Sequence, residues 1–134
     1  MSHPVITALP WLAVALLAAG CGKVREEGKS NALEAATSAY GSAIRWGYYE
    51  TALGYLHPDQ RRELPPGLED IRVTSYEVVQ PPLRQDDDSA IQVVRVEYLH
   101  DEVQRVKGLT DRQTWRYDPD TKTWWLHSGL PPLR

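Results

Sequence analysis

The stretch QTWRYDPDTKTWWL at residues 113–126 decides the fold. Large and polar side chains alternate up to Tyr117, a pattern typical of a β-strand with one buried face. The segment Asp118-Pro119-Asp120-Thr121 that follows has turn chemistry, with proline at the second position of a type I turn. Because residues 123–127 then return as a strand, the stretch predicts an antiparallel hairpin.

The three tryptophans of this hairpin are expected to differ in burial. Trp115 lies between the polar residues Thr114 and Arg116, so it should point into the core. Trp124 and Trp125 are neighbours in a strand and therefore point to opposite faces, which leaves one ring for the surface. The sequence does not decide which of the two is buried.

Upstream of the hairpin the hydrophobic pattern also has a period of two. Residues 90–99 are rich in β-branched side chains and predict a central strand. Residues 71–78 alternate with an irregularity that indicates a bulge, and Pro81-Pro82 should end this strand. The stretch 103–117 predicts the next strand, in which Gly108 indicates a second bulge.

Before residue 58 the period changes to that of a helix. Asn31 is a candidate N-cap with Glu34 three residues later, and the apolar stripe that follows predicts a helix to about Trp46. Within this helix Gly41 suggests a close approach by another part of the chain. At Gly47 the stripe shifts register, so we expect a break and a second helix that ends near His57, before Pro58. Helices followed by a meander predict an α+β domain over residues 30–134, with the helices packed on one face of a curved, antiparallel, four-stranded sheet.

This order of elements, with its aromatic segments at residues 46–53, 113–118 and 124–126, resembles the NTF2-like superfamily. A cystatin-like roll is the alternative, although it has no natural place for the second helix. The resemblance implies a cone whose sheet and helices enclose a cavity. It also implies a choice of functions, because the superfamily contains isomerases, dehydratases and non-catalytic binding modules.

Aromatic side chains gather where such a cavity would lie. Large rings supply much buried area, and their polar edges need partners, so the same residues suit either a core or a ligand site. The cavity-lining candidates are Tyr40, Trp46, Tyr49, Trp115, Tyr117, Trp124 and Trp125.

Catalytic and metal chemistry finds little support in the sequence. Neither His100 nor His127 has a partner at a spacing that indicates acid–base catalysis. The acidic clusters at residues 86–88 and 118–120 lack the spacing of a calcium loop and predict exposed turns. A net charge of −3 and a pI near 5.8 argue against nucleic acid as a partner. We therefore expect no catalytic residue, metal or cofactor.

Residues 5–19 form an apolar run without a charged side chain, interrupted by Pro10. The run is shorter than the roughly 18 to 20 residues of a membrane-spanning helix and is typical of a signal peptide. Its end, Leu17-Ala18-Ala19-Gly20-Cys21, resembles the lipobox of bacterial lipoproteins. Two features depart from that pattern, since residues 1–4 carry no Lys or Arg and Ala18 replaces the commonest leucine. The alternative is a buried helix with a core cysteine, which the prolines disfavour.

The lipobox resemblance implies that residues 1–20 are removed and that Cys21 carries a diacylglycerol and an added acyl chain such as palmitate. Two or three chains, at about 0.8 kcal/mol per buried methylene, anchor a protein stably. Gly22 after the cysteine, in place of Asp, implies the outer membrane. Residues 21–29 should then be a flexible tether, because they are polar and contain two glycines.

Together these features predict a lipid-anchored protein that faces the periplasm and acts as a non-catalytic binding or interaction module, with the membrane and an envelope protein as partners. Two alternatives stay open. One is an isomerase or dehydratase that uses the cavity, which a buried carboxylate or His bonded to a Tyr would favour. The other is a structural accessory subunit, which an exposed apolar patch on the sheet would favour.

Cys21→Ala should leave an uncut precursor that the membrane retains poorly or that stays anchored by its signal peptide, because the acylated thiol is the predicted anchor. Fractionation and gel migration of the variant beside the parent measure this. Identical behaviour of the two proteins would contradict the lipoprotein interpretation.

Overall fold

A computed structural model of the chain describes residues 2–4 and 10–134, with side chains described for residues 2–4 and from Gly22 onward. The chain divides into two compact units, Met1–Asn31 and Ala32–Arg134. Residues 1 and 5–9 of the expected signal peptide, and the side chains of residues 10–21, lie outside the described part, so lipid attachment stays a prediction. Within the described residues, no helix has the length and apolar character needed to cross a membrane.

The backbone differs from expectation at residues 21–29, which belong to the helix α1 (Pro10–Arg45) and not to a flexible tether. Helix-forming Lys, Arg and Glu residues fill this stretch, and two glycines cost only about 1 kcal/mol each. The helix therefore runs through Asn31 without the N-cap that was expected there. The side chains of residues 22–31 are almost all exposed, so this stretch is not packed.

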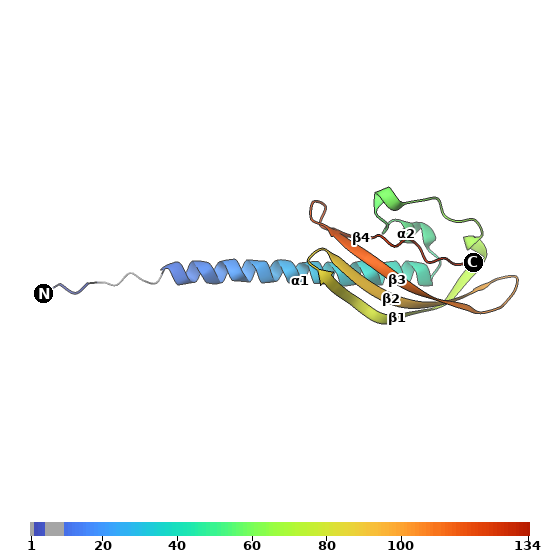
Figure 1. Cartoon of the computed structure of the whole chain (residues 1–134), viewed down its shortest axis with the longest axis horizontal. Helices are drawn as coiled ribbons and strands as arrows, with labels where there is room; N and C mark the ends of the chain where they lie inside the picture. The colour runs from blue at the N-terminus through green and yellow to red at the C-terminus, as the bar shows by residue number, and fades with distance from the viewer. Residues whose placement is uncertain (1, 5–9) are drawn as a thin grey trace. The chain divides into compact units, whose positions relative to one another are not determined.

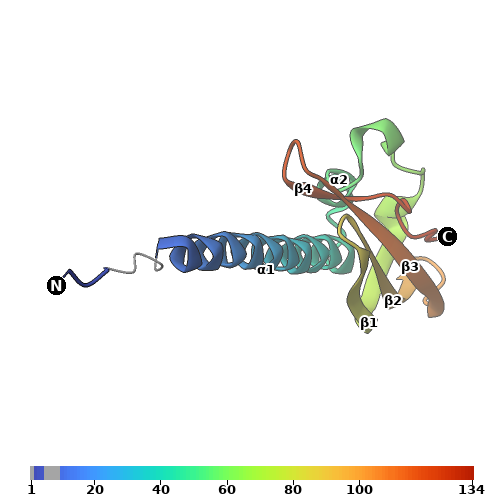
Figure 2. The same ribbon diagram turned by 60° about the vertical axis from the view of Figure 1, so that its left-hand side comes forward.

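The second unit is an α+β domain, as predicted. After α1 come α2 (Tyr49–Leu53), the 3₁₀ turns η1 (Pro58–Gln60) and η2 (Leu68–Asp70), and four strands. These are β1 (Ile71–Asp86), β2 (Ser89–His100), β3 (Lys107–Asp118) and β4 (Thr123–Leu126), joined in the order β1-β2-β3-β4 with every pair antiparallel. The curved sheet carries the end of α1 on one face, and α2 lies near β4 (Figures 1 and 2). Between helix and sheet lies the core, whose fully buried apolar members include Tyr40, Ile44, Val94, Val96, Trp115 and Leu126.

The break after α1 occurs at Gly47, as predicted, where a φ of 77° reverses the chain. Helix α2 is shorter than expected and ends at Leu53. Instead of extending to His57, the chain pairs with β4: the Leu126 N–H donates to the Tyr55 carbonyl at 2.8 Å, and the His57 N–H donates to the Leu126 carbonyl at 3.2 Å. This pairing satisfies backbone groups that a longer helix would have used.

The expected end of the first strand at Pro81-Pro82 is wrong, because β1 continues to Asp86. β1 is an edge strand, where proline is tolerated because one side of the backbone needs no partner. The pairing shifts between Gln80 and Leu83, so both prolines fall within an irregularity. Further shifts, including one after Val73, confirm the predicted bulge.

The expectations for the third strand need two corrections. The strand begins at Lys107, and residues 103–106 form a loop with Gln104 at a φ of 55°. Gly108 marks no bulge, since it pairs in register with Glu97. A Cβ at Gly108 would lie 2.9 Å from the Arg95 guanidinium, so this glycine makes room for a neighbouring side chain.

The predicted close approach at Gly41 is confirmed. A Cβ there would lie 2.7 Å from the ring of Tyr76, which comes from β1. The missing side chain thus lets the Tyr76 ring lie directly against α1.

Trp115→Ala should destabilise the domain by about 3 to 5 kcal/mol, because the indole is fully buried against the ring of Tyr40 at 5.6 Å. That loss is a large part of the roughly 5 to 15 kcal/mol that holds a small domain together. Urea unfolding of the full chain measures it. Trp125→Ala is the matched control, since this ring is only partly buried and its loss should change stability little. Equal stability of the parent and Trp115→Ala would contradict the assigned face.

Candidate functional site

A buried polar network lies on the inner face of the sheet, centred on Gln113. Its amide oxygen accepts from Gln92 Nε2 and from Trp115 Nε1, both at 3.1 Å. Its amide nitrogen donates to the Tyr76 hydroxyl at 2.9 Å and to Asp111 Oδ2 at 3.2 Å. The network therefore brings a carboxyl and a phenol to one amide.

Tyr40 brings a second phenol to this region from α1. Its hydroxyl is buried and has no hydrogen-bond partner among the described residues. Burial, and then the nearby carboxyl of Asp111 and the Tyr76 phenol, raise the pKa of Tyr40 well above its ordinary value. An unpaired buried hydroxyl is uncommon in folded proteins, and a catalytic role is one of the explanations for such a group.

The same burial shifts the other two ionisable groups. It raises the pKa of Asp111, although the hydrogen bond from Gln113 acts in the opposite direction. Burial also raises the pKa of Tyr76 to about 12, opposed by the Gln113 bond and assisted by Asp111. Both phenols are therefore protonated at neutral pH.

A surface pocket of about 390 Å³ reaches the edge of this network. It lies between α1 and β1, and Tyr76 and Gln92 are part of its lining. Asp111 and Tyr40 do not line it. Aromatic rings instead occupy the space between helix and sheet. The centroid of the Tyr40 ring lies 6.2 Å from that of Tyr55 and 5.6 Å from that of Trp115.

The residues Asp111, Gln113, Gln92 and Tyr76 were not among the site residues expected from the sequence. A signal was present, because residues 111 and 113 share the face of Trp115 in an alternating strand. These polar residues were not expected to be buried, because the face that points to the core was assumed to be apolar.

The aromatic candidates separate into three groups. Tyr40, Trp115 and Trp124 are buried in the core, and the partly buried Tyr117 ring packs against Trp124 at 5.2 Å. Trp125 lies on the opposite face from Trp124, near His57 at 6.0 Å and below the Arg61 guanidinium at 5.7 Å. Trp46 and Tyr49 line a pocket at the rim.

This rim pocket, of about 780 Å³, lies between the α1–α2 break and the start of β1. Trp46 is 65% exposed there, where an enclosed position had been expected. Arg45 covers its ring at 4.3 Å and is itself fixed by a 2.9 Å hydrogen bond from Nη1 to the Val73 carbonyl. Across the pocket, Arg72 pairs with Asp101 at 3.3 Å.

The histidines His57 and His127 and the two acidic turns make local contacts. His127 stacks near His57 at 5.2 Å, and burial, Arg116 and His57 lower its pKa. Residues 86–88 and 118–120 form turns, as predicted, in which the Asp86 and Asp118 carboxylates accept backbone N–H groups at 2.9 Å. Within the part of the chain that the structure describes, no three His, Cys, Asp or Glu side chains converge as a metal site.

No family model matches the sequence, and no curated protein does. Among solved structures, a ketosteroid isomerase-like protein from Erwinia carotovora atroseptica is similar, with a TM-score of 0.52 and 17% identity. The match covers 72% of this chain and 88% of that one. The fold is NTF2-like. At this identity the likeness to the Erwinia protein establishes the fold alone.

Asp111→Asn should make stability less dependent on pH. Because burial raises the pKa of Asp111 above 3.8, the folded chain holds this proton more tightly than the unfolded chain does. The contribution of the protonated Asp111 carboxyl to the free energy of unfolding is complete at low pH, and it is lost as the pH rises through the raised pKa. The neutral amide avoids that loss, so the stability of the variant relative to the parent should increase as the pH rises above the ordinary carboxyl pKa of about 4.

Urea unfolding at a series of pH values measures this difference. Asp120→Asn, at an exposed turn position, is the control for the removal of one carboxylate. Parallel pH profiles for the parent and Asp111→Asn would contradict the prediction.

Proposed function

We propose that this protein is a lipid-anchored component of the bacterial envelope whose NTF2-like domain binds a partner without catalysing a reaction. The observation that supports this proposal is that side chains fill the space between the helix and the sheet. Where the fold would hold a substrate cavity, the rings of Tyr40, Trp115 and Trp124 pack together with the aliphatic core. A substrate would have to displace these rings to reach Asp111, at a cost of several kcal/mol for each.

The rim pocket supports binding at the surface instead. An exposed tryptophan held in one orientation can bury a large area on association at a small entropic cost. Arg45 supplies that orientation for Trp46 through ring stacking and its bond to Val73. The exposed Val78 and Val79 on β1 give a partner protein further apolar area.

The envelope location rests on the apolar run and the lipobox-like residues that end at Cys21. A chain anchored there would present its domain to periplasmic partners.

Trp46→Ala should abolish partner capture and leave stability nearly unchanged, since the ring contributes to the surface and not to the core. Cross-linking of the full chain in bacterial envelopes, followed by identification of the attached proteins, measures this. Tyr48→Ala is the matched control, because Tyr48 is equally exposed at 64% but does not line the pocket. If Trp46→Ala captures the same proteins as the parent, the rim pocket is not the binding site.

A second candidate is an enzyme of the isomerase type, which the buried Asp111 and the unpaired Tyr40 hydroxyl favour. In it, Asp111 would exchange a proton with the substrate while Tyr40 donates a hydrogen bond. The name of the Erwinia protein makes a ketosteroid the first substrate to assay. If the parent isomerises the ketosteroid and Asp111→Asn does not, the result would favour an enzyme over the binding module.

A further inference from the structure

Residues 130–134, Leu-Pro-Pro-Leu-Arg, form a strap across one end of the second unit. Pro131 and Leu133 are buried, while Pro132 and Arg134 are exposed. The Leu133 N–H donates to the Pro131 carbonyl at 2.8 Å, which makes a tight turn at Pro132. The strap thus inserts two apolar side chains without belonging to a helix or a strand.

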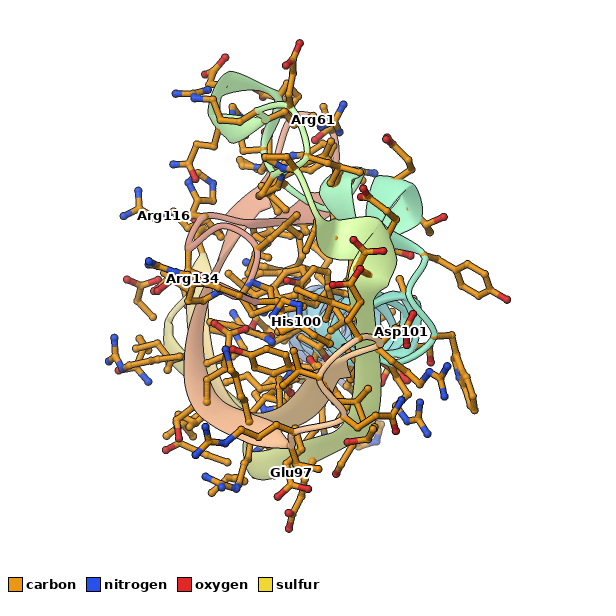
Figure 3. The ribbon with its side chains drawn as sticks, turned by 90° about the vertical axis from the view of Figure 1, so that its right-hand side faces the viewer. Arg61, Glu97, His100, Asp101, Arg116 and Arg134 are labelled. Carbon is orange, nitrogen blue, oxygen red and sulfur yellow. The ribbon has the colours of Figure 1, made fainter. Side chains whose placement is uncertain are left out.

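The strap lies in a groove of the domain. Ile44, Tyr49, Leu68, Ile71 and His100 form its walls. Figure 3 looks onto this end of the sheet, where Arg134 lies on one side of His100 and Asp101 on the other.

The groove also holds the backbone of the strap. The Tyr98 hydroxyl donates to the Arg134 carbonyl at 3.0 Å and accepts from the Arg134 N–H at 3.3 Å. Lys107 Nζ donates to the same carbonyl at 2.9 Å. Such bonds fix an extended segment whatever its side chains, and the pockets for Pro131 and Leu133 add selectivity.

The strap does not fill the groove. A cavity of about 530 Å³ remains between its residues and the walls. Wall atoms that face this space lack the contacts that a better-fitting segment would give them.

We propose that this groove recognises a proline-rich Pro-Pro-Leu segment of a separate partner protein, and that the strap occupies it in cis until the partner segment displaces it. The inference rests on the proposed binding function and goes beyond the rim pocket, because it adds a neighbouring site that shares Tyr49, Leu68 and Ile71 with that pocket. The chemistry is that of the strap itself: a proline and a leucine two residues apart, followed by a backbone amide and carbonyl for Tyr98 and Lys107. A tethered strap competes at an effective concentration in the millimolar range, so it weakens the apparent affinity for any segment in trans.

The test measures binding of a fluorescein-labelled Leu-Pro-Pro-Leu-Arg peptide to the full chain in detergent by fluorescence anisotropy. Leu133→Ser weakens the cis contact and should tighten peptide binding at least about tenfold relative to the parent. Leu83→Ser is the matched control, because the same four residues, Pro-Pro-Leu-Arg, recur at 81–84, where Leu83 is 58% exposed. It should bind the peptide as the parent does.

A second measurement needs no variant. If the peptide displaces the strap, hydrogen exchange at the Leu133 N–H of the parent should accelerate at saturating peptide, because its bond to Pro131 is lost. Unchanged exchange, or equal binding of a Leu-Ala-Ala-Leu-Arg peptide, would overturn the proposal. The proposal would also be overturned if the parent self-associates and Leu83→Ser abolishes that self-association. In that case the groove would bind residues 81–84 of a second copy of the chain. If these tests fail while Trp46-dependent capture persists, only this inference is lost.

Discussion

The rest of the domain depends on the hydrogen bonds made by the buried amide of Gln113. Four hydrogen bonds use both its oxygen and its nitrogen, and they join side chains of β1, β2 and β3. An amide with two donors and two acceptor positions is satisfied by this set, so it is buried without the penalty of an unpaired polar group. Fully satisfied networks of this kind favour one arrangement of a core over its alternatives.

That arrangement explains why the inner face of the sheet is closed. The bond to Gln113 holds the Trp115 indole, which packs against Tyr40, and another holds the Tyr76 ring against Gly41. Both contacts bring α1 close to the sheet and use the volume that an interior ligand would need. The proposed binding therefore falls at the rim, where Trp46 is exposed and the strap leaves part of the groove around Tyr49 open.

Local patterns predicted the parts of the fold that depend on local chemistry. Alternation placed Trp115 in the core, and Gly47 marked the end of α1, because one inward face and one left-handed backbone position are each visible over a few residues. The length of β1 was not visible in this way, since proline in a strand depends on whether that strand lies at an edge. Asp111 was missed for a related reason, because its burial is stabilised by Gln113 and its surroundings and not by its sequence neighbours.

The two copies of Pro-Pro-Leu-Arg show how far context overrides local sequence. At residues 81–84 the leucine pairs with Ile91 in an edge strand and is exposed, whereas in the strap Leu133 is buried at 8% exposure. The intrinsic preferences of the four residues are the same in both places, so the difference must come from their surroundings. In β1 the surroundings are a hydrogen-bonding strand, and in the strap they are an apolar groove with Tyr98 and Lys107 at one end. The groove imposes a buried conformation on this tetrapeptide, although its leucine is exposed in β1. A recognition site needs this property, because its pockets and hydrogen-bonding groups, and not the intrinsic preference of the segment, must select the bound conformation.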